Sequence, residues 1–227
     1  MTVSCIIPAH NEAARIGAVL EVVARHPLID EVIVLDDGST DGTSAVAAGI
    51  AGIRLIRLPK NRGKTAVLAE GIARARGDLI LLVDADLIGL AATDLTALIR
   101  PVLSGRAGLS ISLRRNAPWL WQRIGLDYIS GERVLPKALI QPHLARLDHL
   151  PRFGFEVFLN DLCIRSAQPI AVVRWPGVIS PMKGVKYGRW AGLRADLRMI
   201  GDLLRSASLT RLCRQIVAMR NLRIGPA

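Results

Sequence analysis

Short apolar runs alternate with amphipathic stretches along the first hundred residues. Four runs, several of them rich in β-branched side chains, predict strands at 2–8, 29–35, 53–58 and 79–83. Apolar residues at helical spacing predict helices at 11–25, from 43 onward and at 64–76. The run 79–83 is wholly apolar, which is typical of a strand buried on both faces. The alternation predicts an α/β fold with a mainly parallel sheet and right-handed crossovers.

The pattern beyond residue 100 is less regular. Helices are expected at 88–103, 155–166 and 193–204, and strands at 109–113 and 171–175. Pro101 is expected to disturb the last turn of the first of these helices, because proline lacks a backbone donor. The segment 131–145 mixes helix formers with two prolines and predicts no definite element. From residue 190 onward the chain is basic and amphipathic.

Polar side chains gather where the four predicted strands end. They are His10-Asn11-Glu12, Asp36-Asp37, the segment 60–64, and Asp84-Ala85-Asp86. Asn11 is also expected to cap the helix that follows the first strand. The carboxyl ends of parallel strands meet at one edge of a sheet, and ligands bind beyond that edge. We therefore expect one polar, ligand-binding rim built by the first hundred residues.

The pair Asp84 and Asp86 follows the buried strand directly. Magnesium favours one or two carboxylates together with water and substrate phosphate oxygens. A cation on this pair would neutralise the charge of a leaving diphosphate. Two acids at a strand end are also typical of a solvated loop, and the pair alone does not decide between the two interpretations.

A second acidic segment, Asp36-Asp37-Gly38-Ser39, ends the second strand. A carboxylate at this position would accept hydrogen bonds from a nucleobase or from ribose hydroxyls. The alternative is an Asx-type turn in which Asp36 or Asp41 caps the next helix. One acid can serve the turn while the other serves a ligand.

The segment 58–65 contains Gly-Lys-Thr between a predicted strand and a predicted helix. A P-loop requires glycine where Leu58 stands, and Pro59 removes a donor from the loop that would cradle phosphate. An NTPase is therefore not expected, and no GxGxxG follows the first strand to support a nicotinamide site. Lys64, at a helix start, is still suited to face a diphosphate.

Four segments taken in order resemble the motifs of family 2 glycosyltransferases. They are Pro8 to Glu12, Leu35 to Asp41, Asn61 to Lys64 and Asp84 to Leu87. The resemblance implies the GT-A fold, a Rossmann-like sheet between helices, and transfer of a sugar from a UDP- or GDP-sugar. It implies that Asp84 and Asp86 bind Mg²⁺ or Mn²⁺, with Asp86 catalytic. It implies further contacts to the nucleotide sugar from Pro8, Ala9, Asn11, Glu12, Asp37, Lys64, Asp84 and Ala85.

Looser similarities in the second half resemble the branch with polyprenyl-phosphate and soluble bacterial glycosyltransferases. Residues 127–133 are similar to its Ser-Gly-x-Arg segment, and residues 183–188 to a basic loop over the donor phosphates. This implies that Arg133, Lys183 and Lys186 bind substrate. The signatures of processive polysaccharide synthases are missing from the sequence.

The acceptor side has one candidate base. Residues 153–156 are similar to a helix start near the acceptor, so Glu156 is expected to take the proton of a hydroxyl acceptor. The alternative is that Glu156 only stabilises the first helical turn, where acids are favoured. A phosphate acceptor is already anionic and needs no base. Arg114, Arg115 and Arg133 would then bind it, or serve as plain surface charge.

Charge is distributed unevenly along the chain. Residues 1–100 hold 10 Lys and Arg against 12 Asp and Glu, whereas residues 101–227 hold 20 against 7, a net charge of +13. The excess predicts an anionic partner, either a lipid-phosphate or small-molecule acceptor or an anionic membrane surface. The alternatives are solubility charge and, for the basic tail, an amphipathic helix packed on the domain. Nucleic acid is not an expected partner, and the oligomeric state is left open.

Cysteine usage and hydropathy suggest the compartment. The three cysteines lie far apart without metal-ligand spacing, which favours a reducing environment. No signal-peptide pattern precedes the first strand, and no apolar stretch reaches the roughly 18 residues of a membrane span. The expected location is the cytoplasm, with peripheral attachment to the inner face of the cell membrane as an alternative.

The expected organisation is one GT-A domain over 1–188 and a basic amphipathic helical tail over 189–227. The domain is divided into a nucleotide-binding half, 1–100, and an acceptor half, 101–188. Two other functions are alternatives to the transferase. A nucleotidyltransferase would need a Gly-rich, Arg-containing loop where residues 8–12 stand. A catalytically inactive GT-A protein that binds a nucleotide or a membrane is the other alternative, and the intact acids at the strand ends argue against it.

Overall fold

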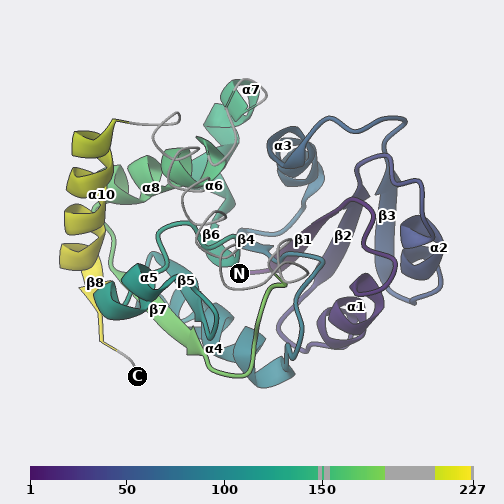
Figure 1. The fold of residues 1–227 in the computed structure, drawn as a ribbon, viewed down its shortest axis with the longest axis horizontal. Helices are drawn as coiled ribbons and strands as arrows, with labels where there is room; N and C mark the ends of the chain where they lie inside the picture. The colour runs from purple at the N-terminus through teal and green to yellow at the C-terminus, as the bar shows by residue number, and fades with distance from the viewer. Residues whose placement is uncertain (148–149, 151–153, 182–207, 226–227) are drawn as a thin grey trace, which may run out of the picture.

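The computed structural model describes residues 1–147, 150, 154–181 and 208–225. One sheet with the strand order β3-β2-β1-β4-β6-β5-β7-β8 runs through the molecule (Figure 1). The strands are β1 Val3–Ala9, β2 Glu31–Asp36, β3 Ile53–Arg57, β4 Leu79–Leu82, β5 Leu109–Arg114, β6 Arg133–Pro136, β7 Ile170–Trp175 and β8 Arg223–Ile224. The helices are α1 Ile16–Ala24, α2 Thr43–Ala48, α3 Lys64–Arg74, α4 Ala92–Leu103, α5 Trp119–Ile124, α6 Lys137–Ile140, the 3₁₀ turn η1 Gln141–His143, α7 Leu144–Leu147, α8 Gly154–Ser166 and α10 Leu209–Leu222.

The sheet is mainly parallel, as predicted. Only β6 runs against its neighbours, β4 and β5, while the other paired strands among the described residues are parallel. Side chains alternate between the two faces of β1, so Ile6 enters one core while Cys5 and Ile7 enter the other. Both faces of the central strands are covered, which explains their continuous apolar sequence.

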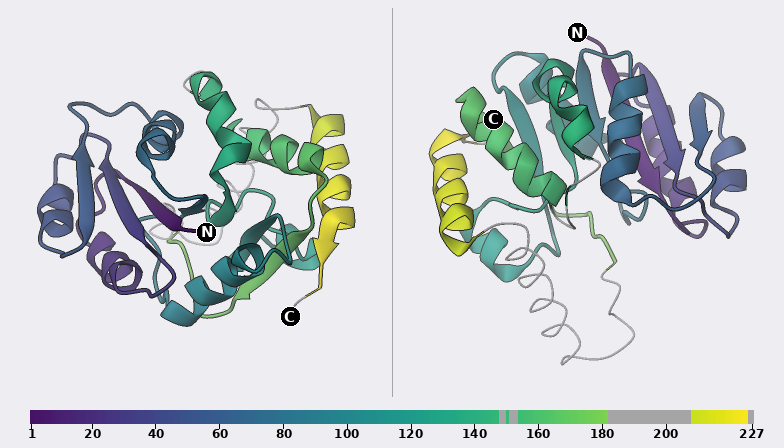
Figure 2. Two further views of the ribbon diagram at one scale, coloured as in Figure 1. Left: turned by 180° about the vertical axis from the view of Figure 1, so that it is seen from behind. Right: turned by 90° about the horizontal axis from the view of Figure 1, so that it is seen from above.

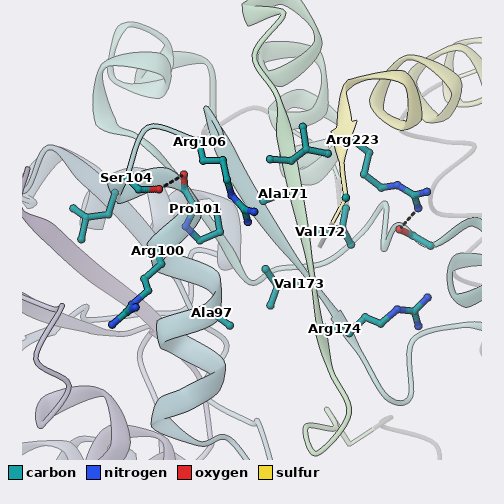
Figure 3. A pocket seen from close by; sticks show the side chains of 14 residues that line it. Ala97, Arg100, Pro101, Ser104, Arg106, Ala171, Val172, Val173, Arg174 and Arg223 are labelled. Carbon is teal, nitrogen blue, oxygen red and sulfur yellow. Dashed lines mark hydrogen bonds between the residues drawn. The ribbon is translucent and has the colours of Figure 1, made fainter. Parts of the chain in front are cut away.

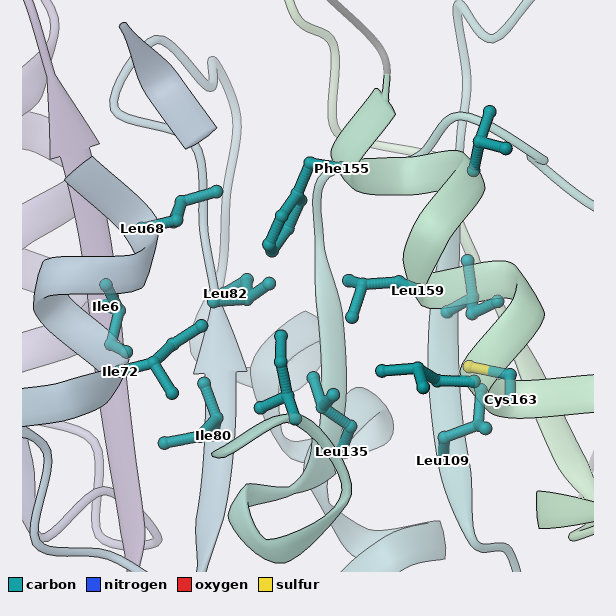
Figure 4. Close-up of a cluster of buried hydrophobic side chains, with 14 of the residues drawn as sticks. Ile6, Leu68, Ile72, Ile80, Leu82, Leu109, Leu135, Phe155, Leu159 and Cys163 are labelled. Atoms are coloured by element: carbon teal, nitrogen blue, oxygen red, sulfur yellow. The ribbon is translucent and has the colours of Figure 1, made fainter. Parts of the chain in front are cut away.

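Two hydrophobic cores hold the helices to the sheet. Helices α1, α2 and α4 cover one face, and α3 and α8 cover the other (Figures 1 and 2). Figure 4 shows Phe155 of α8 pointing toward Leu82 of β4, beside Leu68 of α3. Full burial of one such large apolar side chain contributes roughly 1.5–3 kcal/mol relative to leaving it in water. The second core therefore fixes α3 and α8, the two helices that begin at the rim, against the same strand.

The predicted cap at Asn11 is wrong. Helix α1 begins at Ile16, with Arg15 at its N-cap, and Asn11 lies in the preceding loop with a φ of 56°. The Asn11 side-chain oxygen accepts a hydrogen bond from the Thr40 backbone N–H at 2.9 Å. Asparagine tolerates the left-handed region and bonds local backbone groups, and here it joins the loop after β1 to the loop after β2.

The helix predicted at 88–103 begins later than predicted, and Pro101 lies in its last turn as predicted. Residues 88–91 form a loop in which Ile88 bridges Ile179, and α4 starts at Ala92. The helix continues through Pro101 to Leu103. Because Pro101 lies two residues before the end, its missing N–H costs one hydrogen bond of the last turn without breaking the helix earlier.

The segment 131–145 contains a strand that its sequence does not reveal. Residues Arg133–Pro136 form β6, an antiparallel insertion between β4 and β5. The strand has four residues, ends at a proline and is followed at once by α6. A run this short gives no usable period, and its position between two parallel strands is set by tertiary pairing.

The described part of the predicted tail belongs to the main domain. Helix α10 packs along α8, and β8 extends the sheet beyond β7 (Figures 1 and 2). Leu212 and Met219 of α10 are buried in the same core as α8. For residues 209–224, this packing agrees with the alternative of an amphipathic helix packed on the domain. The helix predicted at 193–204 lies outside the described residues.

Candidate active site

Loops after β1 and β2 form one end of the rim. The Asn11 N–H donates to Ser39 Oγ at 3.0 Å, and the Glu12 N–H donates to Thr43 Oγ1 at 2.8 Å. Pro8 and Ala9 lie at the end of β1, in register with the end of β2. The parallel pairing and these bonds bring the predicted nucleotide-contacting residues of β1 next to the acidic segment of β2.

The Asx-type turn expected after β2 is present, but neither acid caps the next helix, because α2 has Gly42 at its N-cap and no side-chain cap hydrogen bond. Asp36 accepts a hydrogen bond from the Ser39 N–H at 2.8 Å, and Asp41 accepts one from the Thr43 N–H at 3.0 Å. Burial would raise the pKa of Asp36, but hydrogen bonds from Ser39 and Ser44 outweigh it and lower that pKa. These two acids hold the turn in shape.

Asp37 joins the loop after β2 to the loop after β3. Its carboxylate accepts hydrogen bonds from the Arg62 N–H at 2.7 Å and the Gly63 N–H at 2.9 Å. Gly38, with a φ of 68°, allows the contact, because a Cβ there would lie 2.7 Å from the Lys60 carbonyl carbon. A cavity of about 410 Å³ opens beside these loops, lined by Gly38, Ser39, Thr40, Arg57, Leu58 and Pro59.

Lys64 links the nucleotide half of the rim to the acceptor half. Its Nζ lies 2.7 Å from Asp84 Oδ1 and 4.0 Å from Glu156 Oε1. Lys64 is exposed at its edge and Asp84 is partly buried, and the loss of surrounding water opposes charge on both members of the pair. Their mutual attraction and hydrogen bond nonetheless raise the pKa of Lys64 and lower the pKa of Asp84. The structure therefore brings three residues predicted for the site into one charged cluster.

Asp86 lies in a different environment from Asp84. The Ser180 hydroxyl donates to its carboxylate, 3.2 Å from either oxygen. Ser180 is held in turn by Asn116, whose side-chain oxygen accepts the Ser180 N–H at 3.2 Å. Burial raises the pKa of Asp86, and the negative charges of Asp84 and Glu12 raise it further. Asp86 therefore lies at the end of β4 among other negatively charged carboxylates, which disfavour its own charged form.

The acids fit a divalent cation that completes its shell with other ligands. Within the described ranges, no three His, Cys, Asp or Glu side chains converge into a protein-only cage. Asp84 and Asp86 offer two carboxylates, as expected of a Mg²⁺ or Mn²⁺ site that also uses water and phosphate oxygens. A cation beside Asp86 would offset the burial and the neighbouring negative charges that together raise its pKa.

A buried ionic cluster lies at the end of β5, beneath the surface of the rim. Arg114, at the end of β5, lies 3.5 Å from Glu132 and 3.7 Å from Asp127. Both acids are fully buried, and Glu132 also accepts hydrogen bonds from Ser112 and Ser130 at 2.8 and 2.9 Å. Arg114 is therefore tied to internal acids, while its charge also acts on Asp84.

Arg133 does not reach the site. Its side chain is buried, and its guanidinium donates to the Ser130 and Tyr128 carbonyl oxygens and to Asn160 Oδ1, at 2.8, 3.0 and 2.6 Å. A buried guanidinium must satisfy its donors, and these partners do so. We assign Arg133 a structural role in place of the substrate contact expected from the resemblance. Lys183 and Lys186 lie outside the described residues.

Several residues of the site carry little or no sequence signal. Ser180 and Asn116 are 64 residues apart and meet only because a loop after β7 returns to the rim. Asp127 and Glu132 fall in the segment 127–133, and its similarity to Ser-Gly-x-Arg is the one available signal. Nothing in the pattern predicts that these two acids are buried together.

A larger cavity lies away from the rim. It has a volume of about 980 Å³ and opens between α4, β7 and β8 (Figure 3). Four arginines line it, and Figure 3 shows their guanidinium groups pointing in different directions: Arg100, Arg106, Arg174 and Arg223. They do not converge on one point, so the cavity lacks the geometry of a small-anion site.

The sequence comparison identifies the class of protein. Residues 4–157 match the family model described as Glycosyl transferase family 2. The chain therefore belongs to this family, and the predicted family and GT-A-like fold are confirmed. Among the described residues no helix has the length and apolar composition needed to cross a membrane.

Particular relatives differ in their acceptors. Glucosyl-3-phosphoglycerate synthase of Mycolicibacterium smegmatis is 40% identical over 111 residues, covering 45% of this chain and 37% of that protein. Human dolichyl-phosphate beta-glucosyltransferase is 39% identical over 98 residues, covering 37% and 30%. Dodecaprenyl-phosphate galacturonate synthase of Rhizobium johnstonii is 38% identical over 96 residues, covering 38% and 28%. The matched region thus spans less than two fifths of each of these relatives.

Solved structures extend the similarity over most of the chain. Glucosyl-3-phosphoglycerate synthase of Mycobacterium tuberculosis with Mg²⁺ and UDP superposes with a TM-score of 0.70 at 27% identity, covering 90% of this chain and 79% of that one. The same enzyme with Mn²⁺, UDP and phosphoglyceric acid gives 0.70 at 26% identity, covering 93% and 78%. The similarity therefore includes the acceptor half as well as the nucleotide half.

Proposed function

We propose that this chain is a metal-assisted hexosyltransferase that transfers a sugar from a UDP-sugar, with glucose as the first candidate, to a phosphorylated acceptor. The observation that carries the proposal is the cluster of Lys64, Asp84 and Glu156 beside Asp86 at the carboxyl edge of the sheet. The relatives solved with UDP and Mn²⁺ or Mg²⁺ support the choice of nucleotide and metal.

The nucleotide would occupy the end of the rim built by β1 and β2. Pro8, Ala9, Asn11 and Glu12 would line it, and the cavity beside Gly38 offers room for the nucleoside. Asp37 would contribute to nucleotide binding mainly by fixing the loop after β3. Its carboxylate already accepts hydrogen bonds from two backbone N–H groups of that loop.

The diphosphate would lie at the end of β4. Asp84 and Asp86 would hold Mg²⁺ or Mn²⁺, which supplies positive charge to the leaving diphosphate when bound. The Lys64 ammonium group would add a second positive charge at the same place. Charge that is fixed in position before the reaction stabilises a developing anion more effectively than water does.

The acceptor oxygen would attack the anomeric carbon while the bond from that carbon to the diphosphate breaks and UDP leaves. If the acceptor attacks through a hydroxyl, Glu156 would take its proton. If it attacks through a phosphate oxygen, no proton has to be removed, and Glu156 would serve to hold Lys64. Lipid phosphates and phosphoglycerate are the acceptor classes suggested by the relatives.

The test is UDP release from a panel of UDP- and GDP-sugars, with Mn²⁺ and with EDTA, in the presence of phosphoglycerate or polyprenyl phosphate. We expect release from at least one UDP-sugar, and its loss in EDTA. If no nucleotide sugar is turned over or bound, the inactive GT-A alternative replaces the transferase.

A further inference from the structure

Helix α5 presents an exposed apolar and basic surface. This α5 surface consists of Arg115, Trp119, Leu120 and Arg123. Trp119 is 73% exposed and Leu120 is 49% exposed, although both are large apolar side chains. Contiguous apolar side chains left in water mark surfaces that contact a partner or a membrane.

The exposure is built into the fold and does not come from a loosely attached helix. Trp121 is buried with its ring 5.7 Å from the ring of Tyr128. The Gln122 side chain donates to the carbonyl oxygens of Arg114 and Arg115, at 2.5 and 3.3 Å. The helix is therefore anchored on one side, and Trp119 and Leu120 are held outward.

The charge around these side chains has one sign. No acidic residue occurs between Arg114 and Asp127, and Asp127 is buried. The Arg123 guanidinium lies 6.0 Å from the centre of the Trp119 ring, and neither Arg115 nor Arg123 has an acidic partner among the described residues. The surface thus suits a partner that is both apolar and anionic.

The α5 surface lies at the same edge as the site. Strands β4 and β5 both run against β6, so their carboxyl ends point the same way. Asn116, three residues before Trp119, holds Ser180, and Ser180 donates to Asp86. A partner on the α5 surface would therefore lie beside the acceptor half of the rim.

We propose that the α5 surface docks on an anionic lipid bilayer. Tryptophan and arginine are favoured where apolar lipid meets charged headgroups, and a few inserted side chains suffice when basic residues add attraction. A protein partner fits less well, because two side chains cover far less than the roughly 800 Å² per partner of a standard interface. The net charge of +13 over residues 101–227 adds attraction to an anionic surface.

This inference favours a lipid-linked phosphate among the proposed acceptors, and that step rests on the proposed function. The docking itself does not, since it can be measured without nucleotide or acceptor. A failure of docking and a failure of sugar transfer can therefore be told apart.

The experiment is co-sedimentation of the chain with vesicles of phosphatidylglycerol and phosphatidylcholine, or of phosphatidylcholine alone, without nucleotide. We expect binding only to the anionic vesicles, and a drop of about tenfold or more for Trp119→Ser combined with Leu120→Ser. The matched control is Leu209→Ser combined with Val217→Ser, which removes two exposed apolar side chains of α10 and should bind like the parent.

A second pair of variants tests the charge. Arg123→Gln should weaken binding by several-fold, whereas Arg25→Gln, an exposed arginine after α1, should not. The proposal is overturned if the parent binds no anionic vesicles, or if the α5 double variant binds as well as the parent. It is also overturned if the parent self-associates through α5 and the double variant only abolishes that association.

Discussion

The two ends of the rim are built in different ways. At the ends of β1 and β2, loops are held by hydrogen bonds among motif residues, such as those from Asp37 to the loop after β3. At the ends of β4 and β5, contacts join distant segments, such as Ser180 with Asp86. Motif residues therefore build the β1–β2 end of the rim, whereas contacts with segments beyond residue 100 complete the β4–β5 end.

The electrostatics of the two ends differ as well. Hydrogen bonds lower the pKa of Asp36 and Asp41, so these acids are satisfied within the fold. Burial and neighbouring acids raise the pKa of Asp86, and burial raises the pKa of Asp127 to about 6. The acids of the β1–β2 end thus favour their charged forms, whereas a cation or a proton would neutralise Asp86 and Asp127 at the β4–β5 end.

The largest effect is expected from Asp86→Asn. If Asp86 holds the cation, loss of one carboxylate should lower UDP-sugar turnover by about a thousandfold or more with the fold unchanged. Asp94→Asn, in the first turn of α4, is the matched control and should keep nearly full activity. Equal activity of Asp86→Asn and the parent would remove Asp86 from the metal site.

A stability effect is expected from the buried cluster under β5. Burial raises the folded-state pKa of Asp127 from 3.8 to about 6, although Arg114 acts in the opposite direction. The folded protein therefore gains stability below pH 4 that it loses as the pH rises through 6. Asp127→Asn lacks this titration, so its unfolding free energy should rise relative to the parent by up to about 3 kcal/mol between pH 4 and pH 7.

Urea unfolding of both proteins at several pH values measures this difference. A difference that stays constant with pH would contradict the raised pKa assigned to Asp127.

Glu156→Gln separates the two acceptor chemistries. With an acceptor that attacks through a hydroxyl, loss of the base should lower kcat by about a hundredfold or more. With an acceptor that attacks through a phosphate oxygen, the loss should stay below about tenfold, because no proton transfer is required. Initial rates with both acceptor types give the comparison, and equal losses would remove Glu156 from the role of base.

Gly131→Ala should give the smallest effect and tests the contact between the halves. An added Cβ would lie 2.8 Å from Asp84 Oδ2 and 3.0 Å from Lys64 Nζ. The displaced pair should lower kcat/KM by about tenfold, since small misplacements of charged groups at a site are costly. Gly225→Ala, where a Cβ meets open space, is the control. Unchanged kcat/KM in Gly131→Ala would show that the β6 loop does not position the Lys64–Asp84 pair.

Much of the nucleotide half could be predicted from the sequence. The apolar runs gave β1 to β4, and the polar strand ends indicated Asp84, Asp86 and Lys64, because strand direction in a parallel sheet fixes which ends meet. The role of Asn11 was predicted wrongly, since its side chain bonds a loop 29 residues away instead of its own helix.

The acceptor half was less predictable for physical reasons. Strand β6 is too short to show a period, and its antiparallel place is set by pairing with β4 and β5. Arg133 belongs to a motif, but burial turned its guanidinium inward to carbonyl oxygens. The approach of Ser180 to Asp86 depends on a contact across 94 residues, which no local pattern encodes.

The most direct test of the metal-dependent nucleotide site is calorimetry of UDP binding with and without Mn²⁺. The parent and Asp94→Asn should bind UDP at least about tenfold more tightly with Mn²⁺, and Asp86→Asn should lose that gain. Binding of UDP that is unaffected by Mn²⁺ in the parent, or a full Mn²⁺ effect in Asp86→Asn, would contradict the assignment of the metal to Asp84 and Asp86.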